Sequence, residues 1–146
     1  MKKLSTIFLL LVLIFTFISC SDAGAGGETE LDGNVVYRDH LAGTSWTDNV
    51  IDVGATLVFN ADGFTLTAAD ATEGTGTVDT DLLSYDDLTG LSGSVVLNFS
   101  SSFNGADSSE PCIVSDEDIS VTVNAYNSAL DMVIPVYSGS FTRDQD

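Results

Sequence analysis

From Leu41 to the end of the chain, apolar and polar residues alternate with a period of two. The clearest example is segment 55–60, ATLVFN, which the turn 60–63, NADG, joins to segment 64–68, FTLTA. Successive side chains of a β-strand point to opposite faces, whereas a helix repeats its faces every 3.6 residues. The alternation around this glycine-containing turn therefore predicts a β-hairpin.

The same alternation, broken by turn residues roughly every 8–12 positions, predicts an all-β domain. Further strands are expected at 74–79, 82–85, 94–100, 112–114, 119–126, 132–137 and 139–143. No segment shows helical periodicity. Residues 34–41 are predicted to be a transition into the domain, and 101–110 to be a loop. About eight to ten short strands with short turns are typical of a small antiparallel barrel or of a sandwich.

The first 19 residues have the features of a signal peptide. Two lysines follow the initiator methionine, and residues 4–18 are 15 uncharged, mostly apolar positions. A helix of that length spans about 22 Å, which is short of the ~30 Å hydrocarbon core of a bilayer. The sequence therefore predicts a signal peptide over 1–19.

Residues 17–20, FISC, resemble the lipobox of bacterial lipoproteins, although Phe17 stands where leucine is usual. In that family a peptidase cuts before a cysteine that carries diacylglycerol. The resemblance implies lipidation of Cys20 and attachment to the bacterial cell envelope by acyl chains such as palmitate, which hold a protein stably when two or more are present. The alternatives are an ordinary secretory signal and an uncleaved anchor. Residues 20–33 are predicted to be a flexible acidic linker, and 34–146 the all-β domain.

The charge of the chain excludes several classes of function. Both lysines lie within residues 1–19, so the rest of the chain sets 22 acidic residues against Arg38 and Arg143, a formal net charge of −20. Nucleic-acid binding requires a basic surface, and no lysine remains for covalent chemistry. Anionic lipid headgroups also repel such a domain, so the lipid alone would hold it at the membrane.

Three segments resemble parts of the lipocalin-like domains of bacterial lipoproteins: 41–46, LAGTSW; 55–65, ATLVFNADGFT; and 137–143, YSGSFTR. The spacing before the tryptophan is one residue longer than in that family. The resemblance implies an up-and-down barrel of about eight strands, with an immunoglobulin-like sandwich as the alternative fold. It also implies that Trp46 lies at the closed end of the barrel under Arg143 from the last strand, in a cation–π contact that contributes about 0.5–2 kcal/mol.

The sequence predicts neither an enzyme nor a cofactor. It lacks the Gly-x-Ser-x-Gly elbow of many hydrolases, and the single histidine, His40, is interpreted as a solvated residue at the edge of the domain. Cys112, in the apolar run 111–114, is interpreted as a small buried hydrophobe. With Cys20 lipidated, it would have no partner for an intrachain disulfide.

Acidic loops raise the possibility of Ca²⁺ binding, but no metal site is predicted. Asp79 with Asp81, Asp86 with Asp87, and the run 116–118 supply oxygen ligands without the order of an EF-hand. These acids are interpreted as keeping the domain soluble and its strand edges unpaired.

Two hypotheses of function follow from this pattern, and both are non-catalytic. One is that the barrel binds a small hydrophobic ligand; the alternative is a surface or periplasmic protein-interaction module without such a ligand. The residues expected to face the interior are Leu57, Phe59, Phe64, Leu66, Val95, Leu97, Phe99, Val121, Val123, Ile134 and Phe141.

Overall fold

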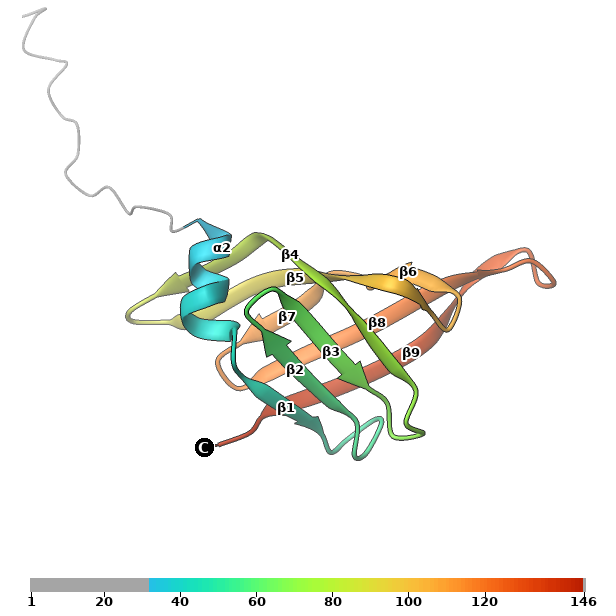
Figure 1. Ribbon diagram of the computed structural model, residues 1–146, viewed down its shortest axis with the longest axis horizontal. Helices are drawn as coiled ribbons and strands as arrows, with labels where there is room; N and C mark the ends of the chain where they lie inside the picture. Colours follow the sequence, from blue (N-terminus) through green and yellow to red (C-terminus); the bar gives the residue numbers. More distant parts are fainter. Residues whose placement is uncertain (1–31, 146) are drawn as a thin grey trace, which may run out of the picture.

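The computed structural model describes residues 32–145, and the predicted signal peptide and Cys20 lie outside this range. Its main feature is a closed barrel of eight antiparallel strands, which confirms the predicted lipocalin-like architecture (Figure 1). The strands are β1 (Ser45–Asp48), β2 (Thr56–Asn60), β3 (Gly63–Thr67), β4 (Glu73–Asp86), β5 (Gly90–Phe103), β7 (Cys112–Ser115), β8 (Asp118–Asn127) and β9 (Met132–Arg143). A short ninth strand, β6 (Ala106–Ser108), pairs with the second half of β5.

Strand order follows the chain, as expected for an up-and-down barrel. Each strand pairs with its neighbours in sequence, β5 passes to β7, and β9 returns to β1. The closing pair is short: Trp46 lies opposite Arg143, and Asp48 lies opposite Phe141. The first part of β9 extends with the end of β8 beyond the barrel as a two-stranded ribbon (Figure 1).

A short helical segment precedes the barrel, where the sequence predicted only a transition without helix. It comprises α2 (Gly33–Val36) and the π-helical turn η1 (Tyr37–Leu41). The side chain of Asp32 caps α2 by accepting a hydrogen bond from the backbone N–H of Asn34 (2.9 Å). Because so short a helix is marginal by itself, its stability depends on packing, and Val36 and Leu41 are fully buried. Within residues 32–145, no helix is both long and apolar enough to cross a bilayer.

Two predicted strand boundaries are wrong for one physical reason. Segments 74–79 and 82–85 form the single strand β4, interrupted by a register shift between Asp79 and Leu82. The predicted loop 101–110 contains the end of β5 and all of β6. A bulge breaks the alternation without ending a strand. In β4 it leaves Thr80 buried against α2, where the Thr80 Oγ1 donates to Asn34 Oδ1 (3.2 Å).

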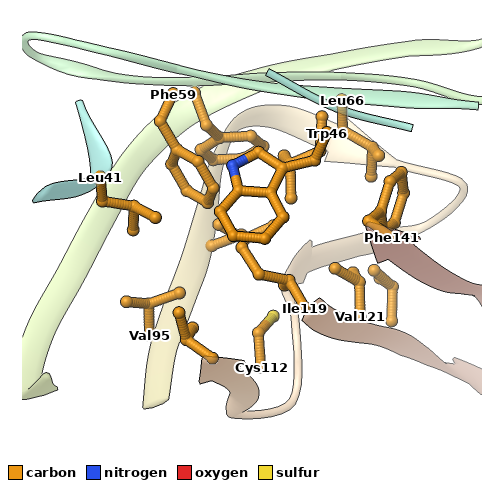
Figure 2. Packing of buried hydrophobic residues seen from close by; sticks show 14 of the residues in the cluster. Leu41, Trp46, Phe59, Leu66, Val95, Cys112, Ile119, Val121 and Phe141 are labelled. Carbon is orange, nitrogen blue, oxygen red and sulfur yellow. The ribbon is translucent and has the colours of Figure 1, made fainter. Parts of the chain in front are cut away.

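Side chains of the barrel itself fill its interior (Figure 2). All residues predicted to face inward are buried except Ile134, which is only half-buried because it lies on the protruding ribbon. Two glycines show how close the packing is. A Cβ atom on Gly74 would lie 2.7 Å from ring carbons of Phe99 and Phe103, and one on Gly139 would lie 2.5 Å from a ring carbon of Phe141. At both points the interior has no room for a methyl group.

Candidate functional site

The structure brings Trp46 and Arg143 together at the end of the barrel that α2 and η1 cover, hereafter the closed end. The guanidinium carbon of Arg143 lies 5.6 Å from the centroid of the fully buried Trp46 ring. Arg143 Nη2 also donates to the backbone oxygen of His40 (3.3 Å), and the indole N–H donates to Thr44 Oγ1 (2.7 Å). The pair therefore joins the first strand, the last strand and the helical segment.

Tyr37 is a second buried polar residue whose bonding needs are met at the closed end. Its hydroxyl donates to the backbone oxygens of Asn60 (2.6 Å) and Gly63 (2.7 Å) at the β2–β3 turn. Burial, together with the nearby charge of Asp62, raises the pKa of Tyr37 to about 12. The hydroxyl therefore stays protonated at neutral pH and fixes the helical segment to the barrel.

His40 lies at the edge of the domain as predicted, but it is less solvated than predicted. His40 belongs to η1, is half-buried, and stacks on Tyr85 of β4 with ring centroids 3.6 Å apart and an interplanar angle of 11°. The sequence contains no signal of this contact, because His40 lies outside any periodic pattern. The position of η1 depends on its packing against the end of the barrel.

Cys112 is buried, which confirms its interpretation as a small core residue. Burial raises the pKa of its thiol to about 11, and a hydrogen bond with Ser109 (3.3 Å) partly offsets that effect. A buried thiol that stays protonated at neutral pH is a poor nucleophile. Cys112 therefore contributes packing rather than reactivity.

The acidic loops shape turns near the closed end. Asp86 Oδ1 accepts hydrogen bonds from the backbone N–H groups of Leu88 (2.8 Å) and Thr89 (3.0 Å), which lower the pKa of this carboxyl. Asp116 Oδ1 accepts from the N–H of Leu91 (2.9 Å). No group of three or more His, Cys, Asp or Glu side chains among residues 32–145 is arranged to hold a metal ion.

At the opposite end of the barrel, hereafter the open end, a buried carboxylate organises the loop between β1 and β2. Asp48 is fully buried and accepts four backbone hydrogen bonds, from Val50 (2.7 Å), Ile51 (2.9 Å), Asp52 (2.9 Å) and Ser140 (2.8 Å). Burial would raise the pKa of this carboxyl, but the four N–H donors outweigh burial and hold the pKa below its usual value. Asp48 thus fixes the loop to β9 as an anion.

The open end also contains a pocket of about 480 Å³. Its lining comes from the β1–β2, β3–β4 and β5–β6 connections and from the first half of β9. The lining residues are Ile51, Asp52, Ala68, Asp70, Asn104, Pro135, Val136, Tyr137 and Ser138. Sequence reasoning missed this pocket because it had no means to bring these distant segments together.

Tyr137, which lines the pocket, differs from Tyr37. Its hydroxyl is buried and has no hydrogen-bond partner within residues 32–145. Its ring meets Phe103 edge to face, with centroids 5.7 Å apart. Burial raises the pKa of Tyr137, and the nearby carboxylates of Asp52 and Asp48 add to the effect. The hydroxyl therefore lies beside Asp52, although no hydrogen bond of good geometry joins the two.

Large apolar side chains are exposed on two segments at the open end. One is the β1–β2 loop and the other is the tip of the β8–β9 ribbon, which projects past the barrel (Figure 1). The exposed residues are Val50, Ile51 and Val53 on the loop, and Tyr126, Leu130, Met132 and Val133 at the tip. Ile51 and Pro135 also line the pocket, so the two apolar segments flank it.

Comparisons with protein-family models, with curated proteins and with solved structures find no match to this chain. The fold is therefore defined by strand order and register, and the open end is the candidate site on the basis of its geometry.

Proposed function

We propose that the protein is a lipid-anchored protein of the bacterial cell envelope whose non-catalytic barrel binds another envelope protein through its open end. The observation that carries this proposal is the contrast between a closely packed interior and the exposed apolar side chains that gather on two segments at the open end. Seven large apolar side chains are exposed there, against three elsewhere among the described residues, namely Leu82, Leu88 and Ile113. Contiguous exposed apolar surface on a soluble domain is typical of an interaction site.

The packing of the interior favours a protein partner over the alternative, a small hydrophobic ligand inside the barrel. Phe99 and Phe103 stack with centroids 4.9 Å apart directly against Gly74. A ligand at that level would have to displace these rings, which would cost the dispersion energy of close packing. A protein that binds the rim requires no such rearrangement.

The β8–β9 ribbon is suited to contact a partner. Two-stranded ribbons are marginally stable alone in water, and this one exposes Leu130 (61%) and Val133 (59%). A partner that covers these side chains would gain about 25 cal/mol for each Å² of apolar surface removed from water. Because the chain from residue 20 onward has a net charge of −20, the partner surface is expected to be apolar with basic or neutral edges.

The place where the described chain begins is compatible with this arrangement. Residue 32, where the described chain begins, lies beside α2 at the closed end (Figure 1). A lipid on Cys20 would therefore attach the domain through a linker that joins it at the closed end. The open end would then face away from the point of attachment.

The anchor is tested by Cys20→Ser in the full chain. We expect the variant to move from the membrane to the soluble fraction and to lose incorporation of labelled palmitate. Wild-type protein without label, or a variant that stays on the membrane, would overturn the anchor.

The interaction is tested by in-cell photo-cross-linking from position 130 at the ribbon tip. The matched control is position 82, because Leu82 is at least as exposed as Leu130 (70% against 61%) but lies in strand β4 of the barrel. We expect position 130 alone to capture a defined partner, which binds again as a purified protein and is lost in the double variant Val50→Ser, Ile51→Ser. Equal products from both positions would overturn the proposal, and a retained lipid-sized mass in native mass spectrometry would favour the hydrophobic-ligand alternative.

A further inference from the structure

We propose that the open-end pocket binds an organic cation, namely a primary ammonium or guanidinium group carried on an apolar stem. Asp52 and Asp70 would hold the charged head, and Tyr137 would form part of the same polar subsite. The cation could come from a lysine or arginine side chain of a protein partner or from a free alkylamine. Only the first of these sources rests on the proposed function.

The two carboxylates are fixed in place while retaining capacity to accept hydrogen bonds. Asp52 Oδ2 accepts from the N–H of Ala69 (3.1 Å), and Asp70 Oδ1 accepts from the N–H of Thr72 (2.9 Å). A carboxylate offers about four acceptor positions, so each can accept further N–H donors. The bonds from Thr72 lower the pKa of Asp70, which therefore stays anionic at neutral pH.

The Tyr137 hydroxyl gives an independent indication of a ligand. The Tyr137 side chain is 9% exposed, and its hydroxyl oxygen has no partner within the described residues. Buried polar groups are bonded in the great majority of cases, and each exception requires an explanation. An N–H donor bound to Asp52 would lie beside this hydroxyl and supply the missing partner. A cation has such donors and also compensates the carboxylate charge.

The remaining lining residues suit an apolar stem. Ile51, Pro135 and Val136 present hydrocarbon surface beside the carboxylates. The volume of about 480 Å³ is within the range of about 300–1,000 Å³ typical of small-molecule sites. Among the lining residues there is no lysine or arginine, so an anionic ligand would be repelled. A head that donates several N–H bonds on a stem of a few methylenes matches both halves of the pocket.

The direct test titrates the full chain in detergent with n-pentylammonium at physiological salt, followed by NMR or calorimetry. Pentanol and pentanoate are the neutral and anionic controls of equal length. We expect saturable binding of the amine, binding at least about tenfold weaker for the alcohol, and none for the acid. Absence of saturable amine binding would overturn the proposal.

Variants separate the pocket from the general acidity of the chain. Asp52→Asn with Asp70→Asn should weaken amine binding at least tenfold, and Tyr137→Phe several-fold with the fold retained. The matched control, Asp79→Asn with Asp87→Asn, removes the same charge outside the pocket lining and should leave binding unchanged. Equal weakening by both pairs would overturn the pocket in favour of non-specific attraction.

A second arm identifies the source of the cation. A short peptide with one lysine should compete with n-pentylammonium if the source is a protein side chain, whereas its norleucine analogue should not. Competition supports the partner side chain, and amine binding without competition supports a free amine. The cation pocket and the proposed function can fail separately. If the protein binds no amine but position 130 still cross-links to a partner, the cation pocket is overturned and the proposed function stands.

Discussion

The two ends of the barrel each contain a buried tyrosine, and the two tyrosines differ in their bonding. At the closed end, the Tyr37 hydroxyl donates to two backbone oxygens. At the open end, the Tyr137 hydroxyl is buried without a partner within the described residues. The closed end therefore satisfies its own polar groups, whereas the open end has an unmet hydrogen-bonding need beside a pocket.

Exposed large apolar side chains are also more numerous at the open end, although Leu88, in the β4–β5 turn near the closed end, is 95% exposed. At the closed end, Val36 and Leu41 cover the barrel and are fully buried. At the open end, Val50 and Leu130 are exposed to water (73% and 61%). One end has the features of a region under selection for stability, and the other has those of a surface that functions when something binds to it.

The largest expected effect is at the closed end, from Trp46→Ala. Removing this fully buried ring should lower the free energy of unfolding by about 3–5 kcal/mol, measured by urea denaturation. The matched substitution Leu130→Ala at the exposed tip should cost less than about 0.5 kcal/mol. Similar losses at the two positions would contradict the division between the ends.

Asp48→Asn tests the one part of the open end that we assign to stability. The asparagine amide would place its own N–H donors against backbone N–H groups whose hydrogen bonds the carboxylate now accepts. We expect a loss of about 2–3 kcal/mol in the free energy of unfolding. The control is Asp87→Asn, at an exposed position, which should be near neutral.

Asp48 also predicts a pH dependence. Its folded-state pKa lies below the usual value, so its contribution is complete above the unfolded-state pKa of about 3.9 and falls as pH drops toward the folded-state value. Wild-type protein should lose stability more steeply than Asp48→Asn below about pH 4. Parallel curves in acid denaturation would show that the carboxylate has no such role.

The two tyrosines sharpen the comparison most directly. Tyr37→Phe should cost about 1–2 kcal/mol because it removes the bonds to Asn60 and Gly63. Tyr137→Phe should cost nothing or add up to about 1 kcal/mol, since it removes an unpartnered buried hydroxyl. Thermal unfolding of both variants measures the difference, and a larger loss for Tyr137→Phe would reverse the interpretation.

Among the substitutions expected to destabilise the closed end, the smallest effect is expected for Arg143→Gln. Arg143 is partly exposed, so loss of its contact with Trp46 should cost about 0.5–1 kcal/mol. Arg143→Lys should recover part of this loss because it keeps the cation. Chemical denaturation and tryptophan fluorescence monitor both variants, and an unchanged emission spectrum would indicate that the guanidinium does not act on the ring.

Local pattern was sufficient for most of the barrel and for none of the pocket. Alternation around Gly63 predicted the hairpin of β2 and β3, which the structure has at nearly the same residues. Alternation failed at the bulge near Thr80, where one extra residue in β4 shifts the face of the strand. It gave no signal for η1, because five residues packed on a barrel end have no period of their own.

The sequence by itself determined the all-β class, the inward set of side chains and the acidic character of the domain, because each depends on neighbouring residues or on composition. Only the tertiary structure decided which loops meet at the open end and which hydroxyl is buried without a partner among the described residues. It also decided that Gly74 and Gly139 lie against aromatic rings, where a larger side chain would not fit. These features depend on side chains from distant segments that barrel closure brings into contact, and no local pattern encodes that proximity.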